Sequence, residues 1–226
     1  MTKTIFPPIF IISLKHSDRR EFISDRLSSL GLRFQFIDAV YGKDLTDEDL
    51  SKVDFEFYPQ RFGSKKPLTK GELGCALSHI GIYEKMVKEN IPEAIILEDD
   101  AIVNLYFPEI LKEALEKLPK RAEMLFLDHG KAKVFPLMRS LPERYRLARY
   151  LTPSKNSKRT ITCTAAYYLK LEGAKKLLSK AYPLRLPADY LTGLLQLTGV
   201  HAYGIEPACS TSGHRSQIDD QGNRYD

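Results

Sequence analysis

The sequence predicts a single α/β domain, because segments typical of strands alternate with helical segments along the whole chain. Residues 9–14 (IFIISL) and 94–97 (AIIL) are short, mostly apolar runs, as in strands buried on both faces of a parallel sheet. The chain also opens in the order strand, helix, strand, which is typical of a nucleotide-binding half. These two observations together predict the fold class.

Length and composition agree with this prediction. The 226 residues, 43% of them hydrophobic and 28% charged, suit a globular domain with a substantial core. No apolar run is long enough to span a membrane, and the first residues do not read as a signal peptide. The three cysteines are far apart and form no C-x-x-C pair, which disfavours a disulfide framework or a zinc knuckle. We therefore expect a cytoplasmic protein.

The first helix follows residues 9–14. Ser17 or Asp18 can cap it, Phe22 is one of its apolar positions, and Gly31 ends it. A strand at 34–38 then ends in an acid. Neither G-x-G-x-x-G nor G-x-x-x-x-G-K-[ST] occurs, which disfavours a dinucleotide enzyme or a P-loop kinase.

The next segment contains two helix starts. Thr46 caps a short helix, residues 54–68 are expected to be irregular, and Thr69 with Glu72 forms a capping box. The helix after this box should run to about residue 90. Its expected buried face recurs at three- and four-residue steps and consists of Leu73, Leu77, Ile80, Tyr83 and Val87.

Acidic residues follow three predicted strands. Residues 94–97 run directly into Glu98-Asp99-Asp100, strand 34–38 ends at Asp38, and strand 124–127 precedes Asp128. Ligands of open α/β sheets bind beyond such strand ends. Carboxylates placed there repel one another, and a hard divalent cation would relieve the repulsion. A solvated acidic turn is the alternative that these residues leave open.

The second half of the chain begins with a helix at 107–118 and contains a basic segment at 139–159. That segment is either a solvated loop or a contact for anionic lipid head groups or an acidic substrate. Nucleic acid is disfavoured as a partner, because no nucleic-acid module accompanies the charge. A strand at 162–169, helices at 173–178 and from Pro187, and a strand at 201–205 should follow. Residues 210–226 are expected to be a mobile polar tail.

Several blocks of the sequence carry a family resemblance. They are residues 11–14 with Arg19-Arg20, 68–79 (LTKGELGCALSH), 97–100 (LEDD), 164–167 with 173–178, and 187–189. Through them the chain resembles glycosyltransferase family 25, the lipooligosaccharide galactosyltransferases of Gram-negative bacteria and their collagen-modifying relatives. The resemblance implies a GT-A fold with a Rossmann-like mixed sheet flanked by helices. It also implies a UDP-sugar donor, Mn²⁺ or Mg²⁺, and inversion at the anomeric carbon.

The resemblance assigns roles to individual residues. Asp100 is the expected direct metal ligand, and Glu98 takes the place of the first acid of Asp-x-Asp, on the metal, on a metal-bound water or on the ribose. His214 resembles a further metal ligand, and Asp189 resembles the general base. Asp189 as a mere helix-start charge and His214 as a tail residue remain the alternatives. Residues 5–130 would bind the nucleotide sugar, and residues 160–216 would carry the acceptor and catalytic part.

Further residues are expected to contact the substrates. Donor-binding candidates are Ser13, Arg19, Asp38, Glu72, Ser78, His79 and Asp99. Acceptor-binding candidates are Tyr167 and Asp128. Each of three candidates has a structural alternative. Glu72 could serve only as the partner in the capping box, and His79 could be a hydrogen-bonded histidine of the core. Tyr167 could simply pack within its strand.

The expected function is transfer of a hexose, most often galactose in β linkage, from a UDP-sugar to a lipooligosaccharide or lipopolysaccharide core. With no leader and no retention tail in view, the bacterial branch is favoured over the collagen-modifying one. The acceptor would be a lipid-linked glycan at the inner face of the inner membrane, with possible peripheral contact there. An inactive nucleotide-sugar or glycan-binding module is the main alternative. A phosphoryl-transfer enzyme is a further one, which the missing P-loop disfavours.

Overall fold

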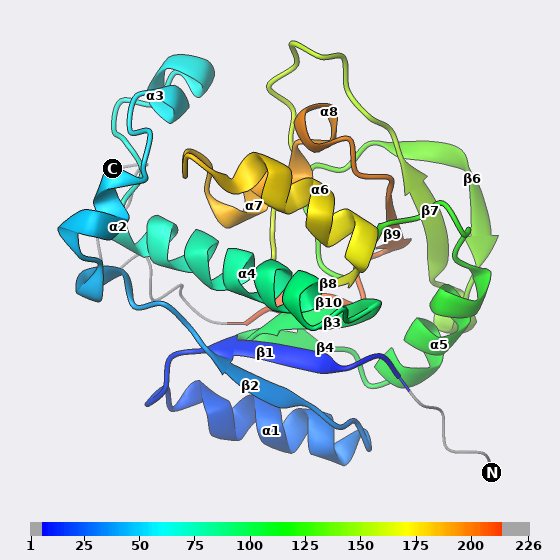
Figure 1. The fold of residues 1–226 in the computed structure, drawn as a ribbon. Coiled ribbons are helices and arrows are strands. Elements are labelled where there is room, and N and C mark those ends of the chain that lie inside the picture. The colour runs from blue at the N-terminus through cyan, green and yellow to red at the C-terminus, as the bar shows by residue number, and fades with distance from the viewer. Residues whose placement is uncertain (1–5, 214–226) are drawn as a thin grey trace.

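A computed structural model describes residues 6–213, and within them the main sheet has eight strands (Figure 1). Their order across the sheet is β2-β1-β3-β8-β5-β9-β7-β6. The strands are β1 (Ile9–Ser13), β2 (Gln35–Asp38), β3 (Glu93–Glu98), β5 (Met124–Phe126), β6 (Val134–Ser140), β7 (Arg146–Tyr150), β8 (Ala166–Lys170) and β9 (Ala202–Glu206). The predicted α/β class with a mixed sheet flanked by helices is confirmed.

Two strands of the sheet, β8 and β7, run opposite to the other six. β1 pairs in parallel with β2 and β3, and β5 pairs in parallel with β9. β8 runs antiparallel between β3 and β5, so β3 and β5 point the same way. β7 is antiparallel to β9 and to β6. The carboxyl ends of β1, β2, β3, β5 and β9 therefore meet at one edge of the sheet, which is where the sequence places its acids.

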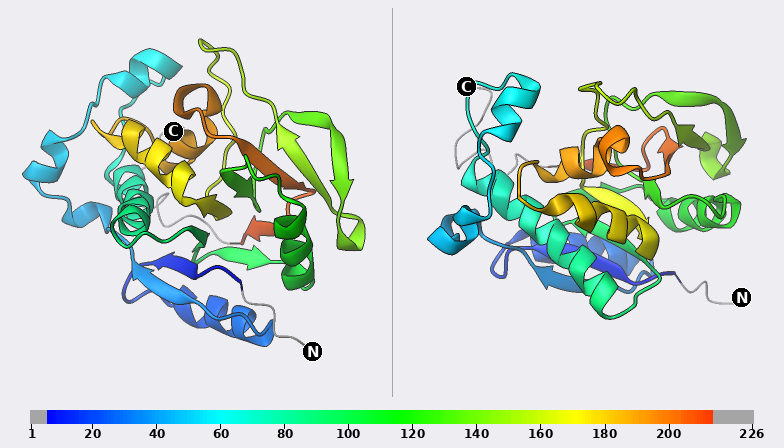
Figure 2. Two further views of the ribbon diagram at one scale, coloured as in Figure 1. Left: turned by 45° about the vertical axis from the view of Figure 1, so that its right-hand side comes forward. Right: turned by 45° about the horizontal axis from the view of Figure 1, so that its top comes forward.

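Helices cover both faces of the sheet (Figures 1 and 2). α1 (Arg19–Ser29) and α5 (Phe107–Lys117) pack on one face. The other face carries α4 (Lys70–Lys88), α6 (Leu171–Ala181), α7 (Ala188–Gly193) and α8 (Leu195–Thr198). Successive residues of β1 enter the two cores in turn, with Phe10 on the α4 side and Ile11 on the α1 side. The prediction that this strand is buried on both faces is confirmed.

A small second sheet joins the end of the described chain to the acidic turn. β4 (Ala101–Val103) pairs antiparallel with β10 (Ser210–Ser212), and the Gly213 N–H donates to the Asp100 carbonyl at 3.0 Å. Neither strand was predicted. The expectation of a mobile tail is wrong for residues 210–212, because ladder hydrogen bonds to β4 hold them. The rest of that expectation, residues 214–226, lies outside the described residues.

Two further segments differ from the sequence prediction. Residues 54–68 contain α3 (Phe57–Phe62), which packs two of its rings against Tyr190 at centroid distances of 5.3 and 4.9 Å. Pro59 lies in the first turn of α3, where its missing N–H costs nothing. Much of the basic segment forms the β6–β7 hairpin instead of a solvated loop, and Leu147 within it is buried. The short elements are η1 (Gly42–Asp44), α2 (Asp47–Ser51) and η2 (Pro142–Arg144).

The helix starts were predicted better than the buried faces. The capping boxes at Thr46 and Thr69 are both present. Leu73, Ile80 and Tyr83 of α4 are buried as expected, but Val87 is exposed and Met86 is buried in its place. Phe22 of α1 is also exposed, contrary to expectation. The buried face of α4 includes small and polar side chains that a count of apolar positions passes over. Within residues 6–213, no helix combines the length and apolar character needed to cross a bilayer.

A glycine pair on α4 allows a matched test of packing. A Cβ at Gly74 would lie 2.7 Å from the Val40 carbonyl oxygen and 2.8 Å from the Gly42 nitrogen, whereas a Cβ at exposed Gly81 meets nothing within 4 Å. We expect Gly74→Ala to lower the free energy of unfolding by about 1–3 kcal/mol. Gly81→Ala should raise it by up to about 1 kcal/mol through helix propensity. Urea denaturation measures both, and equal effects would contradict this account.

Candidate active site

A pocket of about 100 Å³ opens at the carboxyl ends of β1 and β3, beside the first half of α4. It is lined by residues 12–14, Arg19, residues 39–42, Gly71, Cys75, Ser78, His79 and residues 98–100. Seven of the residues proposed from the sequence therefore meet in one place. They are Ser13, Arg19, Ser78, His79, Glu98, Asp99 and Asp100.

Asp99 joins the ends of the two strands. It accepts a hydrogen bond from Ser13 Oγ at 2.7 Å, and its other oxygen is 3.5 Å from Arg19 Nη1. The same guanidinium nitrogen is 3.8 Å from Asp100 Oδ2. Arg19 thus offsets part of the repulsion that three adjacent acids would otherwise feel. Ser13 and Asp99, both buried, fix the edge of the pocket, and Arg19 is the cation that faces it.

Asp100 is the acid whose charge is least compensated. Its side chain is 11% exposed, and Oδ1 has no hydrogen-bond partner among residues 6–213. Burial raises the pKa of this carboxyl from 3.8 to about 7, with the charges of Glu98 and Asp99 adding to the effect and Arg19 opposing it. A buried carboxylate oxygen without a donor fits a hard divalent cation, which prefers oxygen ligands. The residues present therefore fit the Mn²⁺ or Mg²⁺ that the sequence leads us to expect.

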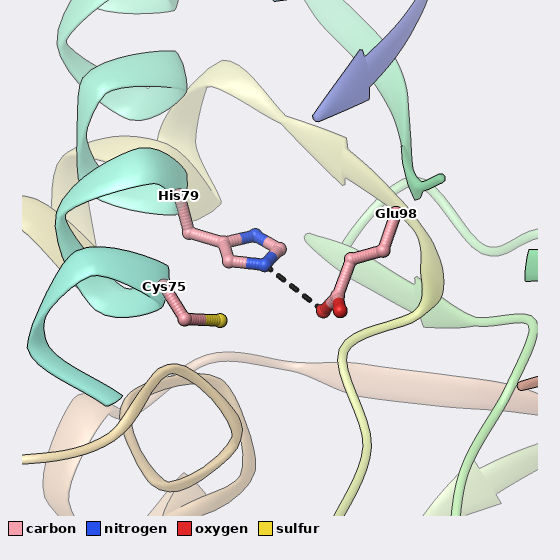
Figure 3. Close-up of side chains that lie close together, drawn as sticks. All are labelled: Cys75, His79 and Glu98. Carbon is pink, nitrogen blue, oxygen red and sulfur yellow. Dashed lines mark hydrogen bonds and ion pairs between the residues drawn. The ribbon is translucent and has the colours of Figure 1, made fainter. Parts of the chain in front are cut away.

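Glu98 is held differently. Its side chain lies on the α4 side of β3, where Thr164 Oγ1 donates to Oε1 at 2.6 Å and His79 Nε2 lies 3.2 Å away (Figure 3). Burial opposes ionisation of Glu98, but its hydrogen bonds to His79 and Thr164 and the charge of Arg19 outweigh this effect, so its pKa is lowered. The side chain of Glu98, one methylene longer than that of an aspartate, thus reaches His79 on α4. The acid with an unpartnered carboxylate oxygen is Asp100.

A buried relay of hydroxyl groups orients His79. Its Nδ1 is 2.8 Å from the Tyr167 hydroxyl, which is 2.9 Å from the Tyr83 hydroxyl. His79 and Tyr83 lie one turn apart on the face of α4 that packs on the sheet, and Tyr167 comes from β8. Tyr167 is fully buried. The structure therefore places it in the packing role that was the alternative, and not at a surface open to an acceptor.

Asp189 lies in the first turn of α7, half-buried, as the sequence predicts. It belongs to the same charged surroundings as the strand-end acids. Burial raises the pKa of the Cys75 thiol well above its ordinary value, and the carboxylates of Glu98, Asp189, Asp100 and Glu72 raise it further. The charges of Asp189 and of Glu98 thus both act on Cys75.

Besides Tyr167 and Asp189, three other described candidates do not line the pocket. Glu72 closes the capping box by accepting from the Thr69 N–H at 2.8 Å. Asp38 is exposed and pairs with Arg20. Asp128 is buried at the end of β5, where Cys163 Sγ donates to it at 3.1 Å. Predicted contacts of these residues with substrate stay predictions.

His214 lies outside the described residues, so its role as a ligand stays a prediction. The residue before it, Gly213, is hydrogen-bonded to Asp100. Sequence reasoning gave no functional role to Thr164 or to Cys75. The signal for Cys75 was available, because Cys75 and His79 are four residues apart on one helix and therefore share a face.

Comparisons with known proteins identify the family of the chain. The profile of glycosyltransferase family 25 (LPS biosynthesis protein) matches residues 6–192. Procollagen galactosyltransferase 1-A of Xenopus laevis is 31% identical over 96% of this chain and 34% of its own length. A probable inactive glycosyltransferase 25 family member 3 of Bos taurus is 31% identical over 83% of this chain and 31% of its own length.

The chain thus spans about a third of the length of these curated relatives. Among solved structures, A197 from STIV aligns with a TM-score of 0.46 at 11% identity, covering 88% of this chain and 81% of that one, which is too distant to support an argument. The match of the family profile over most of the chain, together with these relatives, shows that the protein is a member of glycosyltransferase family 25.

Proposed function

We propose that this chain is a metal-dependent, inverting glycosyltransferase that moves a hexose from a UDP-sugar to a hydroxyl of an oligosaccharide acceptor. Galactose is the hexose that we propose first. The observation that carries the proposal is the buried oxygen of Asp100, which has no partner among the described residues and lies at a strand end beside Glu98. Membership of the family supports transferase chemistry, and the galactosyltransferase names of several relatives support galactose.

The charged residues of the pocket suggest where each part of the sugar donor would bind. The nucleotide fits beyond the ends of β1 and β3, where Ser13 and the loop at residues 39–42 form the wall of the pocket. Arg19 lines the same pocket and would attract the diphosphate. Asp100, with Glu98 and His214 as further candidates, would hold the Mn²⁺ or Mg²⁺. The bound cation would supply Lewis-acid stabilisation of the diphosphate as it leaves.

Asp189 acts as the base. Its carboxylate takes the proton from the acceptor hydroxyl while that oxygen attacks the anomeric carbon from the face opposite the diphosphate. A new C–O bond forms as the bond to the nucleoside diphosphate breaks, so the configuration inverts. The products are the glycosylated acceptor, UDP, and a protonated Asp189 that returns its proton to solvent. We propose a lipooligosaccharide or lipopolysaccharide core as the acceptor, in line with the description of the family.

A screen of UDP-sugars with Mn²⁺ and core-oligosaccharide acceptors tests the proposal. We expect acceptor-dependent release of UDP, strongest with UDP-galactose, and a β-linked product by NMR. Release of inorganic phosphate would point to phosphoryl transfer instead. Tight UDP binding by calorimetry without turnover on any acceptor would favour an inactive module, a possibility that the name of the Bos taurus relative raises.

We further propose that the β6–β7 hairpin contacts an anionic lipid surface. On β6, Leu137 is 78% exposed, and Phe135 and Met138 are exposed beside it. These side chains line a groove together with Arg121, Arg139 and Arg149. Apolar side chains ringed by arginines match a bilayer that carries negative head groups. Such contact would hold the enzyme near a lipid-linked acceptor.

Co-sedimentation with phosphatidylglycerol vesicles measures this contact. We expect Leu137→Ser combined with Arg149→Gln to weaken vesicle binding at least tenfold, because each arginine near such a surface contributes about 1 kcal/mol and the apolar contact adds to it. Leu105→Ser removes a 59% exposed leucine elsewhere and should change binding little. If the double variant bound vesicles as tightly as the wild type, and if added salt did not weaken the binding, the proposal would be contradicted. A concentration-dependent dimer that loses stability in the double variant would assign the groove to a second copy.

A further inference from the structure

Three potential metal ligands of different chemical type converge beside the pocket (Figure 3). Cys75 and His79 extend from one face of α4, and Glu98 extends toward them from the end of β3. The sulfur, a ring nitrogen and a carboxylate oxygen all lie within 4.8 Å of one another. The proposed catalysis uses Glu98 but gives no role to the thiol.

We propose that Cys75, His79 and Glu98 form a second metal site, selective for Zn²⁺ and similar borderline-soft ions, whose occupation inhibits the enzyme by withdrawing Glu98 from the site of the hard cation. The existence of this site is independent of the proposed function. Only its inhibitory consequence rests on that function.

The spacing of the ligand atoms suits zinc. Tetrahedral Zn²⁺ at its usual bond lengths sets nitrogen and oxygen ligands about 3.3 Å apart, and sulfur about 3.5 Å from each. His79 Nε2 and Glu98 Oε1 are 3.2 Å apart. The Cys75 sulfur lies within 4.8 Å of both, so it needs to move by at most about 1.3 Å to reach tetrahedral spacing.

The surroundings hold the histidine in the way that metal ligands usually require. A metal-bound imidazole donates its other N–H to a fixed partner. Here that partner is Tyr167, whose hydroxyl is 2.8 Å from Nδ1 and is itself backed by Tyr83. Because all three ligands line the pocket, the fourth position of the metal faces the space where the donor would bind. Three protein ligands with one open position are typical of zinc sites that bind water or another small ligand in the fourth position.

The proton balance of binding is simple. Without metal, His79 Nε2–H donates to Glu98 and Tyr167 O–H donates to Nδ1. On binding, the imidazole stays neutral but carries its proton on Nδ1, which donates to Tyr167, while Nε2 bonds to the metal. Cys75 binds as the thiolate, so one proton is released to solvent for each ion bound.

Ligand type separates this site from the one at Asp100. Thiolate and imidazole select zinc and its neighbours, whereas carboxylate oxygens alone suit Mg²⁺ and Mn²⁺. Glu98 borders both sites, because it contacts His79 and its charge acts on Asp100. A zinc ion on Cys75 and His79 therefore competes for Glu98 and obstructs the donor pocket.

Cobalt titration of the full chain tests the site directly. Co²⁺ replaces Zn²⁺ in tetrahedral sites, and a cobalt–thiolate bond gives a characteristic near-ultraviolet charge-transfer band. We expect this band in the wild type, its loss on adding Zn²⁺, and its absence in Cys75→Ser. Cys163→Ser is the matched control, because it removes another half-buried thiol beside an acid, and it should keep the band. No band in the wild type, or an equal band in Cys75→Ser, would overturn the site.

Two measurements separate this inference from the proposed function. Asp100→Asn should keep the cobalt band even where transfer is lost, so the site can be established in an inactive protein. In an active enzyme, the Zn²⁺ concentration for half-inhibition in the presence of Mn²⁺ should rise at least tenfold in Cys75→Ser, each protein being compared with its own uninhibited rate. Equal half-inhibition in the two proteins, with the band present in the wild type, would overturn the competition for Glu98.

Discussion

Replacing Asp100 with asparagine should lower kcat by about 100- to 1,000-fold, the usual effect of removing one main electrostatic stabiliser of a developing charge. Asparagine keeps the shape of the side chain but supplies a neutral, weaker ligand in place of a carboxylate. Excess Mn²⁺ should restore part of the rate if the loss is one of metal affinity. UDP release at saturating donor and acceptor measures the effect. Glu113→Gln, which removes an acid of α5 that pairs with Lys117 and does not line the pocket, is the control and should stay near the wild-type rate.

The same substitution should stabilise the metal-free protein. The pKa of Asp100 is raised to about 7 in the folded state by burial and by its acidic neighbours, from an ordinary 3.8. Asp100 therefore loses its proton less readily in the folded protein than in the unfolded chain. Because of this difference, the wild type loses stability as pH rises from about 4 to 7. With a chelator present, the Tm advantage of Asp100→Asn should be absent below pH 4, grow through this window and level off above it. A constant Tm difference across pH would contradict this account.

Replacing Asp189 with asparagine should lower kcat by about 100- to 10,000-fold and leave the KM for the sugar donor nearly unchanged, because a general base acts on the acceptor hydroxyl. Asparagine cannot take the proton, although it is tolerated in the first turn of a helix. The acidic limb of the pH–rate profile, which reports protonation of the base, should disappear in the variant.

The alternative role of Asp189 predicts a different pattern. If its charge served only to stabilise the start of α7, Asp189→Asn would lower Tm and leave kcat per folded molecule intact. Measuring both quantities on one preparation decides between the roles. A variant that keeps the wild-type rate and the acidic limb would remove Asp189 from the mechanism.

Local rules allowed much of this fold to be predicted. The capping box at Thr69 depends on residues three apart, and the strand at 94–97 depends on an unbroken apolar run, so neither needs knowledge of the whole chain. The acids could be assigned to one edge because parallel strands end together. The start of α7 at Pro187, with Asp189 in its first turn, follows from the same kind of local signal.

Contacts between residues far apart in the chain could not be predicted from local patterns in the sequence. That Glu98 is bound by Thr164 and His79 depends on β8 lying next to β3 and on α4 lying above them. The β6–β7 hairpin was missed because its buried residues, such as Leu147, are interspersed with arginines. The partners of polar groups at a sheet edge are decided by packing, and a single sequence read by local patterns does not contain that information.

The antiparallel strand β8 has a consequence for how the chain reaches its native state. Residues 166–169 of β8 pair with residues 94–97 of β3 and also with β5, so the middle of the sheet joins segments about seventy residues apart. An N-terminal fragment ending near residue 130 would have an open gap between β3 and β5, with two unpaired strand edges. Such edges favour aggregation. The middle of the sheet, next to the acids of β3, is thus completed only after β8 has been synthesised.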